Sequence, residues 1–394
     1  MPESAMIVVI PAYLEKDYIF DCLDSLIRSA DQVEEQIGVI IVVNASVTAP
    51  DVVVKEQEEL FRSLTAFARE NQKDNLRFYP LKEFNIRKKY AGVGSARKIG
   101  MDQAVYMFSR WENYEGVIVS LDADATVAPN YFAELLKYFS NVKRSGCSIF
   151  FQHPLEGEES DAIVLYELYL RYYKNALAFT GFPYAFHTVG SAFALRADRY
   201  VRAGGMPRKQ AGEDFYLIQK AVQMGGWGEL NSTCVYPSPR RSGRVPFGTG
   251  PSVRKMLEGR VEYFTYNIGA FIDLKRFFDQ ADRLFGISEN DFEDLLKTFP
   301  EGVRDFLLND NFFDSLNDLN RNCSTAEVFR KRFFELFNAF KVVKYLNFVH
   351  ERYYAKTDVV EMALRLLELM CVKCECEKAP EKVLNVYRDL ERNS

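Results

Sequence analysis

Long apolar runs are missing from this sequence. No stretch approaches the roughly 18 to 20 residues that a membrane-spanning helix needs, so we expect no transmembrane segment. The first residues, Met1-Pro-Glu-Ser-Ala-Met6, lack the basic and apolar regions of a secretory signal, which predicts a cytoplasmic protein. The 32 Phe and 22 Tyr are abundant, and many lie in the last third of the chain. Peripheral contact with a membrane or a partner therefore stays open.

A strong excess of one charge is also missing. The net charge is −5, and charged residues make up 27% of the chain. This balance argues against nucleic acid or another polyanion as a general partner. Any recognition of an anion must therefore be local.

Cysteine and histidine are too sparse to predict a metal-binding framework. The seven cysteines are an odd number in a chain without a secretory signal, which favours free thiols. Three of them, Cys371, Cys374 and Cys376, lie close together, but a structural zinc site needs four ligands and the nearest histidine is His350. Zinc is disfavoured here, because Cys371 and Cys374 can simply extend the apolar face of the preceding helical pattern.

The glycine motifs of two common nucleotide-binding folds are absent. The segment Gly92-Val-Gly-Ser-Ala-Arg97 has no third glycine at the position that a dinucleotide-binding turn requires, and it follows the third strand-like run rather than the first. A phosphate-binding Gly-x-x-x-x-Gly-Lys-Ser/Thr loop does not occur. Any nucleotide must therefore be bound in another way.

The first 240 residues alternate strand-like and helix-like segments. Buried-strand runs at 6–10, 38–43, 76–79 and 117–121 are each separated by a helical pattern. This order predicts a mainly parallel α/β sheet with right-handed crossovers, and further strands are expected at 148–151 and 233–236. With 394 residues, 48% of them hydrophobic, the chain should form two to three domains.

Two carboxylates follow the fourth strand-like run. Asp122 and Asp124 are predicted to lie on the loop between Val117–Leu121 and a helix that begins after Pro129. Ligands bind at the carboxyl ends of strands in open α/β sheets, and carboxylate oxygens suit Mg²⁺ or Mn²⁺. The alternative is two solvated turn aspartates, one of which caps the helix.

Two later segments carry further charge that could serve catalysis. Glu213 and Asp214 open a helical pattern, where a carboxylate can act as a general base or merely complement the helix dipole. The Gly- and Pro-rich segment 237–251 contains Arg240, Arg241 and Arg244. Guanidinium groups fit phosphate oxygens, so this segment is predicted to bind a diphosphate or an anionic acceptor, unless it is an ordinary basic linker.

The order of these motifs resembles that of family 2 glycosyltransferases of the GT-A fold. The resemblance covers residues 6 to about 240 and rests on Pro11-Ala-Tyr13, Val42-Val-Asn44, Gly94-Ser-Ala-Arg97, Asp122-Ala-Asp124 and Gly212-Glu-Asp214. It implies a transferase that moves a sugar from a nucleotide-diphosphate sugar, with a UDP-sugar favoured, to the hydroxyl of an unknown acceptor. It also implies a Mn²⁺ or Mg²⁺ cofactor.

Carried over to this chain, the resemblance assigns roles residue by residue. The donor would be bound by Pro11, Tyr13, Glu15, Asn44, Arg97, Asp122, Asp124, Gly190 and Ser191, and the Gly- and Pro-rich segment adds Arg240, Arg241 and Arg244 as predicted donor-binding residues. Asp124 is the first choice of metal ligand, with Asp122 nearby on the sugar or the metal. Asp214 would be the general base of an inverting transfer, with Glu213 beside it, and His187 would contact the acceptor unless it is a core histidine.

This chain departs from the family pattern at several positions. Leu14 and Lys98 replace the usual asparagines, and Asn44 stands where an aspartate commonly contacts the base. After Asp214 the only histidine is His350, so the third protein ligand of the metal is missing or different.

The segment after residue 250 shows helical patterns only. Phe329, Phe333, Leu336, Phe337 and Phe340 form one predicted helical face, which is more typical of a core than of a binding groove. We therefore predict a catalytic domain over 1–250 and an α-helical extension over 251–394. Two alternatives to an inverting transferase remain open, namely a retaining GT-A transferase and a nucleotidyltransferase or other nucleotide-binding protein.

Overall fold

The computed structural model describes residues 3–209, 212–240, 256, 259, 263–374 and 379–394. Two compact units divide the chain, and each is considered by itself. The first unit comprises 1–163, 186–257 and 388–394, and the second comprises 164–185 and 258–387. The boundary predicted after residue 250 falls outside the described residues and stays a prediction.

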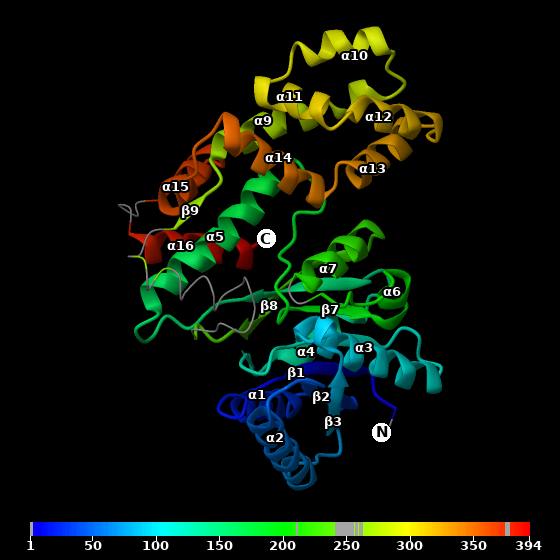
Figure 1. Ribbon diagram of the computed structural model, residues 1–394, viewed down its shortest axis with the longest axis vertical. Helices are drawn as coiled ribbons and strands as arrows, with labels where there is room; N and C mark the ends of the chain where they lie inside the picture. The colour runs from blue at the N-terminus through cyan, green and yellow to red at the C-terminus, as the bar shows by residue number, and fades with distance from the viewer. Residues whose placement is uncertain (1–2, 210–211, 241–255, 257–258, 260–262, 375–378) are drawn as a thin grey trace. The chain divides into compact units, whose positions relative to one another are not determined.

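An eight-stranded sheet forms the centre of the first unit (Figure 1). Its order is β3-β2-β1-β4-β7-β6-β8-β5. The strands are β1 Met6–Ala12, β2 Ile37–Ser46, β3 Leu76–Ile86, β4 Val117–Ser120, β5 Thr126–Val127, β6 Gly146–Phe151, β7 Phe193–Arg196 and β8 Trp227–Tyr236. The pairs β3-β2, β2-β1, β1-β4 and β6-β8 are parallel, whereas β7 pairs antiparallel with β4 and β6, and β5 pairs antiparallel with β8. The predicted mainly parallel sheet is therefore confirmed.

The first strand continues past the predicted run 6–10 and includes Pro11. Pro11 pairs in register with Val42 of β2, whereas the ladder to β4 ends at Val9. At Pro11, β1 therefore pairs with β2 alone. Proline is tolerated at such a position because its missing N–H group leaves no hydrogen bond to a second neighbour unmade.

Helices connect these strands and cover the sheet. They are α1 Ile19–Ala30, α2 Asp51–Glu70, α3 Val93–Arg110, α4 Tyr131–Phe139, α6 Ala197–Arg202 and α7 Glu213–Gln223, with the short 3-10 helix η1 at Lys88–Tyr90. α3 packs on β1 and β2, and α2 packs on β2 and β3. Every residue of β1 is buried, as expected for a strand with helices on both faces.

The second unit is helical apart from one short strand pair. α5, Ser160–Phe179, begins in the first unit and continues into the second. The later helices are α9 Ile268–Phe278, η2 Ala281–Leu284, α10 Glu289–Leu296, α11 Glu301–Asn309, α12 Phe312–Arg321, α13 Ala326–Leu336, α14 Ala339–Arg352, α15 Val359–Leu369 and α16 Pro380–Arg392. The strands β9 Phe264–Thr265 and β10 Thr357–Asp358 pair antiparallel, although no strand was expected after residue 250.

Phenylalanine rings form the core of the second unit. Phe329, Phe333 and Phe337 are buried, which agrees with the predicted core face, and Phe277 packs against Phe333 and Phe337. The face is not one continuous helix, because α13 ends at Leu336 and Asn338 caps α14. In the described part of the chain no helix is long and apolar enough to cross a membrane.

The cysteines are mostly free thiols. Cys22, Cys147, Cys234, Cys323 and Cys371 are free, as predicted. The expectation of free thiols is wrong for Cys374, which is disulfide-bonded. Cys376 lies outside the described residues.

Candidate active site

The parallel order of β2, β1 and β4 brings their carboxyl ends together on one edge of the sheet. β4 ends at Ser120, and a tight turn follows in which the Ala125 N–H donates to the Asp122 carbonyl oxygen at 3.1 Å. Asp122 and Asp124 therefore lie on the loop between β4 and the short β5, at the predicted end of the strand. This edge is where open α/β sheets bind ligands.

Arg97 connects Asp122, which follows β4, with Glu213 at the start of α7. Its side chain, on the first turns of α3, is 4% exposed and forms ion pairs with Asp122 and Glu213. Burial alone would lower the pKa of the Arg97 guanidinium, but the charges of Asp122, Glu213 and Asp214 outweigh it and raise that pKa. Arg97 is therefore a permanently charged centre among carboxylates rather than a surface helix residue.

Two glycines allow close backbone packing around the ion pairs of Arg97. A Cβ atom at Gly94 would lie 2.4 Å from the Lys209 carbonyl oxygen, so a larger residue would push α3 away from the segment that leads into α7. A Cβ atom at Gly190 would lie 2.6 Å from the Arg97 Nη2 atom. The small residues predicted around the donor therefore make room for Arg97 itself.

Asp214 lies in the first turn of α7, directly after the buried Glu213. Its Oδ1 atom accepts a hydrogen bond from the Phe215 N–H at 2.7 Å. Desolvation and the neighbouring charge of Glu213 raise the pKa of Asp214 to about 7, against the lowering effect of Arg97. A carboxyl group with this pKa can accept and release a proton near neutral pH.

Arg240 binds a second group of carboxylates. Its Nη2 atom contacts both carboxylate oxygens of Glu15, at 2.7 and 2.8 Å, and its Nε atom lies 2.7 Å from Asp124 Oδ2. The guanidinium also lies 4.2 Å from the centre of the Tyr18 ring. A cation is therefore already in contact with the predicted metal ligand Asp124.

The ends of β1 and β2 are fixed by a residue that sequence reasoning missed. The buried Gln57 of α2 donates to the carbonyl oxygens of Ala12 and Asn44 and accepts from the Leu14 N–H. Leu14 has a φ of 57°, a strained conformation that the hydrogen bond to Gln57 stabilises. A glutamine on the otherwise apolar face of α2 is the sequence signal that could have revealed it.

Asn44 has an unsatisfied acceptor. The side chain is buried, and its Oδ1 atom has no hydrogen-bond partner among the described residues. A buried amide oxygen without a partner costs free energy, so this atom is available to a ligand that donates a hydrogen bond.

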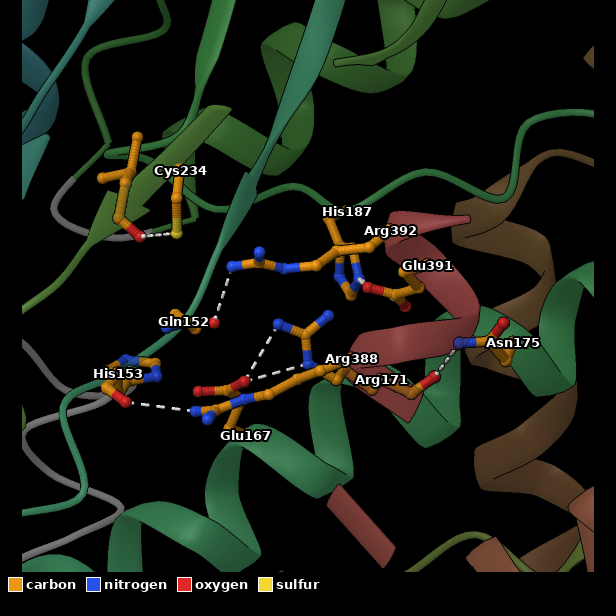
Figure 2. A network of polar contacts seen from close by, with 11 residues as sticks. Gln152, His153, Glu167, Arg171, Asn175, His187, Cys234, Arg388, Glu391 and Arg392 are labelled. Carbon is orange, nitrogen blue, oxygen red and sulfur yellow. Dashed lines mark hydrogen bonds and ion pairs between the residues drawn. The ribbon is translucent and has the colours of Figure 1, made fainter. Parts of the chain in front are cut away.

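The segment with His187, Gly190 and Ser191 is pinned to the sheet. The Gly190 carbonyl oxygen accepts from Ser120 Oγ at 2.7 Å, and Ser191 is buried. The His187 ring is bound to Glu391 rather than to the carboxylates around Arg97 or Arg240. Its Nε2 atom lies 3.0 and 3.1 Å from the two carboxylate oxygens of Glu391 (Figure 2). Arg241 and Arg244 lie outside the described residues.

The predicted residues thus form two charge clusters in the first unit. One contains Arg97 with Asp122, Glu213 and Asp214, and the other contains Arg240 with Glu15 and Asp124. Within the described ranges no group of three or more histidine, cysteine, aspartate or glutamate side chains gathers as a metal site.

Comparison with known families gives this geometry its context. A family model described as glycosyl transferase family 2 matches residues 7–199, which include Arg97, Asp122 and Asp124. This part of the chain belongs to glycosyl transferase family 2. The predicted fold class, a GT-A type sheet with a helical C-terminal region, is confirmed, and the chain carries a glycosyltransferase domain.

Solved glycosyltransferases are similar to this chain at low identity. S. aureus TarS 1–349 in complex with UDP-GlcNAc is 14% identical, with 98% of this chain and 90% of that chain covered and a TM-score of 0.38. A longer S. aureus TarS structure is 14% identical, with 73% of this chain but only 44% of that one covered and a TM-score of 0.37. The mannosyltransferase PcManGT of Pyrobaculum calidifontis, in complex with GDP-Man and Mn²⁺, is 14% identical, with 99% and 87% covered and a TM-score of 0.35. No curated protein matches the sequence significantly.

Proposed function

We propose that this protein transfers a sugar from a nucleoside-diphosphate sugar to an acceptor hydroxyl, with inversion at the anomeric carbon and Asp214 as the general base. The observation that carries the proposal is the buried Arg97, which connects Asp122, on the donor side, with Glu213 and Asp214 at the start of α7. One fixed cation thereby aligns the carboxylates of two sequence-distant motifs. The proposed catalytic domain is 1–250.

The chain's own residues divide the work of the reaction. Asp214 accepts the proton of the acceptor hydroxyl as its oxygen bonds to the anomeric carbon and the bond to the diphosphate breaks. The guanidinium of Arg240 can move from Glu15 and Asp124 to the departing diphosphate, whose negative charge then increases. Gly190 and Ser191 are the proposed neighbours of the donor sugar, and Gly190 leaves room there for the Arg97 guanidinium.

The donor set fits a divalent cation that is shared with the substrate. Asp124 and Asp122 offer hard oxygens, and Asp124 already contacts a cationic group. No third protein ligand joins them among the described residues, so the diphosphate would supply the remaining oxygens. A bound Mn²⁺ or Mg²⁺ would neutralise charge on the diphosphate as a Lewis acid.

A UDP-sugar is the favoured donor. The unsatisfied Oδ1 atom of Asn44 can accept from the N3–H group of uracil, and the amide can donate in return. Tyr13, which follows β1 directly, is the proposed neighbour of the base.

A screen of nucleotide-sugars by thermal shift tests this proposal. UDP-GlcNAc, UDP-glucose and GDP-mannose would each be added with Mn²⁺ and with EDTA. At a concentration of 100 times Kd a ligand adds about 2.7 kcal/mol of stability, which is readily seen as a rise in Tm. We expect a Mn²⁺-dependent rise with at least one UDP-sugar, and a weaker one in Asp124→Asn. If no nucleotide-sugar binds with Mn²⁺, the proposal fails.

The pKa of Asp214 predicts the pH dependence of the reaction. Because the pKa is raised to about 7 and only the ionised carboxylate is a base, the transfer rate should increase with pH and reach half of its plateau near pH 7. The measurement is the rate at saturating donor from about pH 5 to about pH 9. A base of ordinary pKa would give a flat profile over this range, which would contradict the assignment.

Removing Arg240 should have opposite effects on the metal and on the donor. In Arg240→Ala, Asp124 loses its ion pair with Arg240, so Mn²⁺ alone should bind up to about 5-fold more tightly. UDP with Mn²⁺ should bind roughly 10-fold more weakly, because a charge-assisted contact to the diphosphate is lost. Calorimetric titration of both ligands measures this.

A matched control for Arg240→Ala is Arg202→Ala, which removes an exposed arginine paired with Asp198 on α6. Both affinities should stay within about 2-fold of the unmodified protein in this control. Equal affinities in Arg240→Ala and the unmodified protein would show that Arg240 neither competes with Mn²⁺ for Asp124 nor contacts the diphosphate.

A further inference from the structure

The last residues of the chain belong to the first unit, together with the sheet and the candidate active site. Residues 388–394 form part of that unit, although the preceding 130 residues, 258–387, form part of the second. Specific contacts between this segment and the rest of the first unit are therefore expected.

Three side chains of this terminal segment make polar contacts with Gln152 and His153, which follow β6, and with His187 (Figure 2). Arg388 Nη2 donates to the His153 carbonyl oxygen at 3.1 Å, and Arg392 Nη2 donates to Gln152 Oε1 at 3.0 Å. The third contact joins the Glu391 carboxylate to the His187 ring, and both side chains are nearly buried, with exposed fractions of 4% and 10%. A buried carboxylate is costly unless it is paired, so this contact is the most consequential of the three.

His187 is in turn connected to the sheet at two further points. Its carbonyl oxygen accepts from Ser148 Oγ at 2.7 Å, and that hydroxyl oxygen accepts from Trp227 Nε1 at 3.2 Å. Its ring packs edge-on against Phe151, with centroids 5.1 Å apart. The histidine is therefore an anchor of its own segment rather than a side chain turned toward a ligand.

The same segment reaches the active site three residues later. The Gly190 carbonyl oxygen accepts from Ser120 Oγ, at the end of β4, and the Gly190 backbone lies against the Arg97 guanidinium. A shift of the segment at His187 would therefore be transmitted to Gly190 and to the arginine that aligns the carboxylates.

We infer that Glu391 is a positioning residue of the transferase site, which acts through His187 on the Gly190 segment. The predicted effect of Glu391 on the rate of transfer rests on the proposed function, whereas its predicted effect on the position of the Gly190 segment does not. In this proposal Glu391 itself contacts neither the acceptor hydroxyl nor the donor sugar. A misplacement of about 1 Å at a catalytic centre can cost up to about 100-fold in rate, so loss of the contact should be visible in kcat.

Activity and fluorescence together test this inference. Trp111 and Trp227 are the only tryptophans, so a Trp111→Phe background makes Trp227 the sole reporter of the Ser148–His187 contact. In that background Glu391→Ala should shift the Trp227 emission and lower kcat for a UDP-sugar donor roughly 10-fold, with UDP affinity within about 2-fold. Glu391→Gln, which keeps an acceptor for the ring, should restore most of the rate.

His187→Ala combined with Glu391→Ala should reduce kcat no more than either change alone, because both remove the same contact. Arg392→Ala is the control, since it removes the contacts of the same segment with Gln152 and with the Phe150 ring but leaves the Glu391–His187 contact in place, and its rate should be unchanged. An unshifted emission, or an unchanged kcat in folded Glu391→Ala protein, would overturn the inference. If the unmodified protein turns over no donor, the proposed function fails, and the emission shift alone decides whether Glu391 fixes the segment.

Discussion

Replacing Asp214 with asparagine is expected to lower the rate of sugar transfer by about 10²- to 10⁴-fold, the usual contribution of a general base. The amide has nearly the shape of the carboxylate and can still accept from the Phe215 N–H, so the start of α7 should be preserved. It cannot take the proton of the acceptor hydroxyl. The binding of UDP with Mn²⁺ should therefore remain within about 3-fold of the unmodified protein while turnover is lost.

The matched control is Asp198→Asn. Asp198 also lies in the first turn of a helix, α6, and among the described residues its carboxylate pairs with Arg199 and Arg202, so its loss should leave the rate nearly unchanged. Rates would be measured for both variants at saturating donor. An Asp214→Asn enzyme as fast as the unmodified one would show that another group is the base.

Replacing Arg97 with methionine is expected to destabilise the fold by about 3–5 kcal/mol, the usual effect of removing one partner from a buried ion pair. Methionine has a similar length but leaves Asp122 and Glu213 without their counter-charge. Arg97 also lowers the pKa of Asp214, so that pKa should rise further above about 7 in the variant. Urea denaturation at neutral pH measures the loss of stability.

Arg97→Lys separates charge from geometry. A lysine keeps the positive charge, but its single ammonium group does not reproduce the planar fork that reaches two carboxylates at once. We expect intermediate stability and a rate well below that of the unmodified protein. Full stability in Arg97→Met would mean that the buried cluster does not depend on this cation, and the proposed alignment of the carboxylates would be wrong.

The early strands of the sheet could be predicted because their residues are apolar throughout. Met6–Ile10, Gly38–Val43 and Val117–Leu121 are buried on both faces, so no other element competes for the same pattern. The strand β7, Phe193–Arg196, was missed, because four residues within a segment of small side chains give no period of their own. The family pattern assigned that segment to ligand contact, which concealed its place between β4 and β6.

The carboxylates and arginines of the candidate site could be named from sequence, but the ion pairs that connect them could not. Asp122, Asp124, Glu213 and Asp214 follow strand and helix signals that local sequence carries. Sequence alone could not decide whether Arg97 binds the donor or lies on the surface of a helix. Its burial depends on Glu213, a partner 116 residues away. Glu391 is 204 residues from His187, and no local pattern encodes such a contact.

The most direct test of the proposed function is to identify what is released from the donor. The enzyme would be incubated with a UDP-sugar that binds it and with Mn²⁺, and the nucleotide products would be separated and quantified with and without EDTA. We predict Mn²⁺-dependent release of UDP, with cleavage between the sugar and the diphosphate, and its loss in Asp214→Asn. Release of UMP, with cleavage between the two phosphates, would contradict glycosyl transfer and would favour a nucleotidyl or pyrophosphatase reaction.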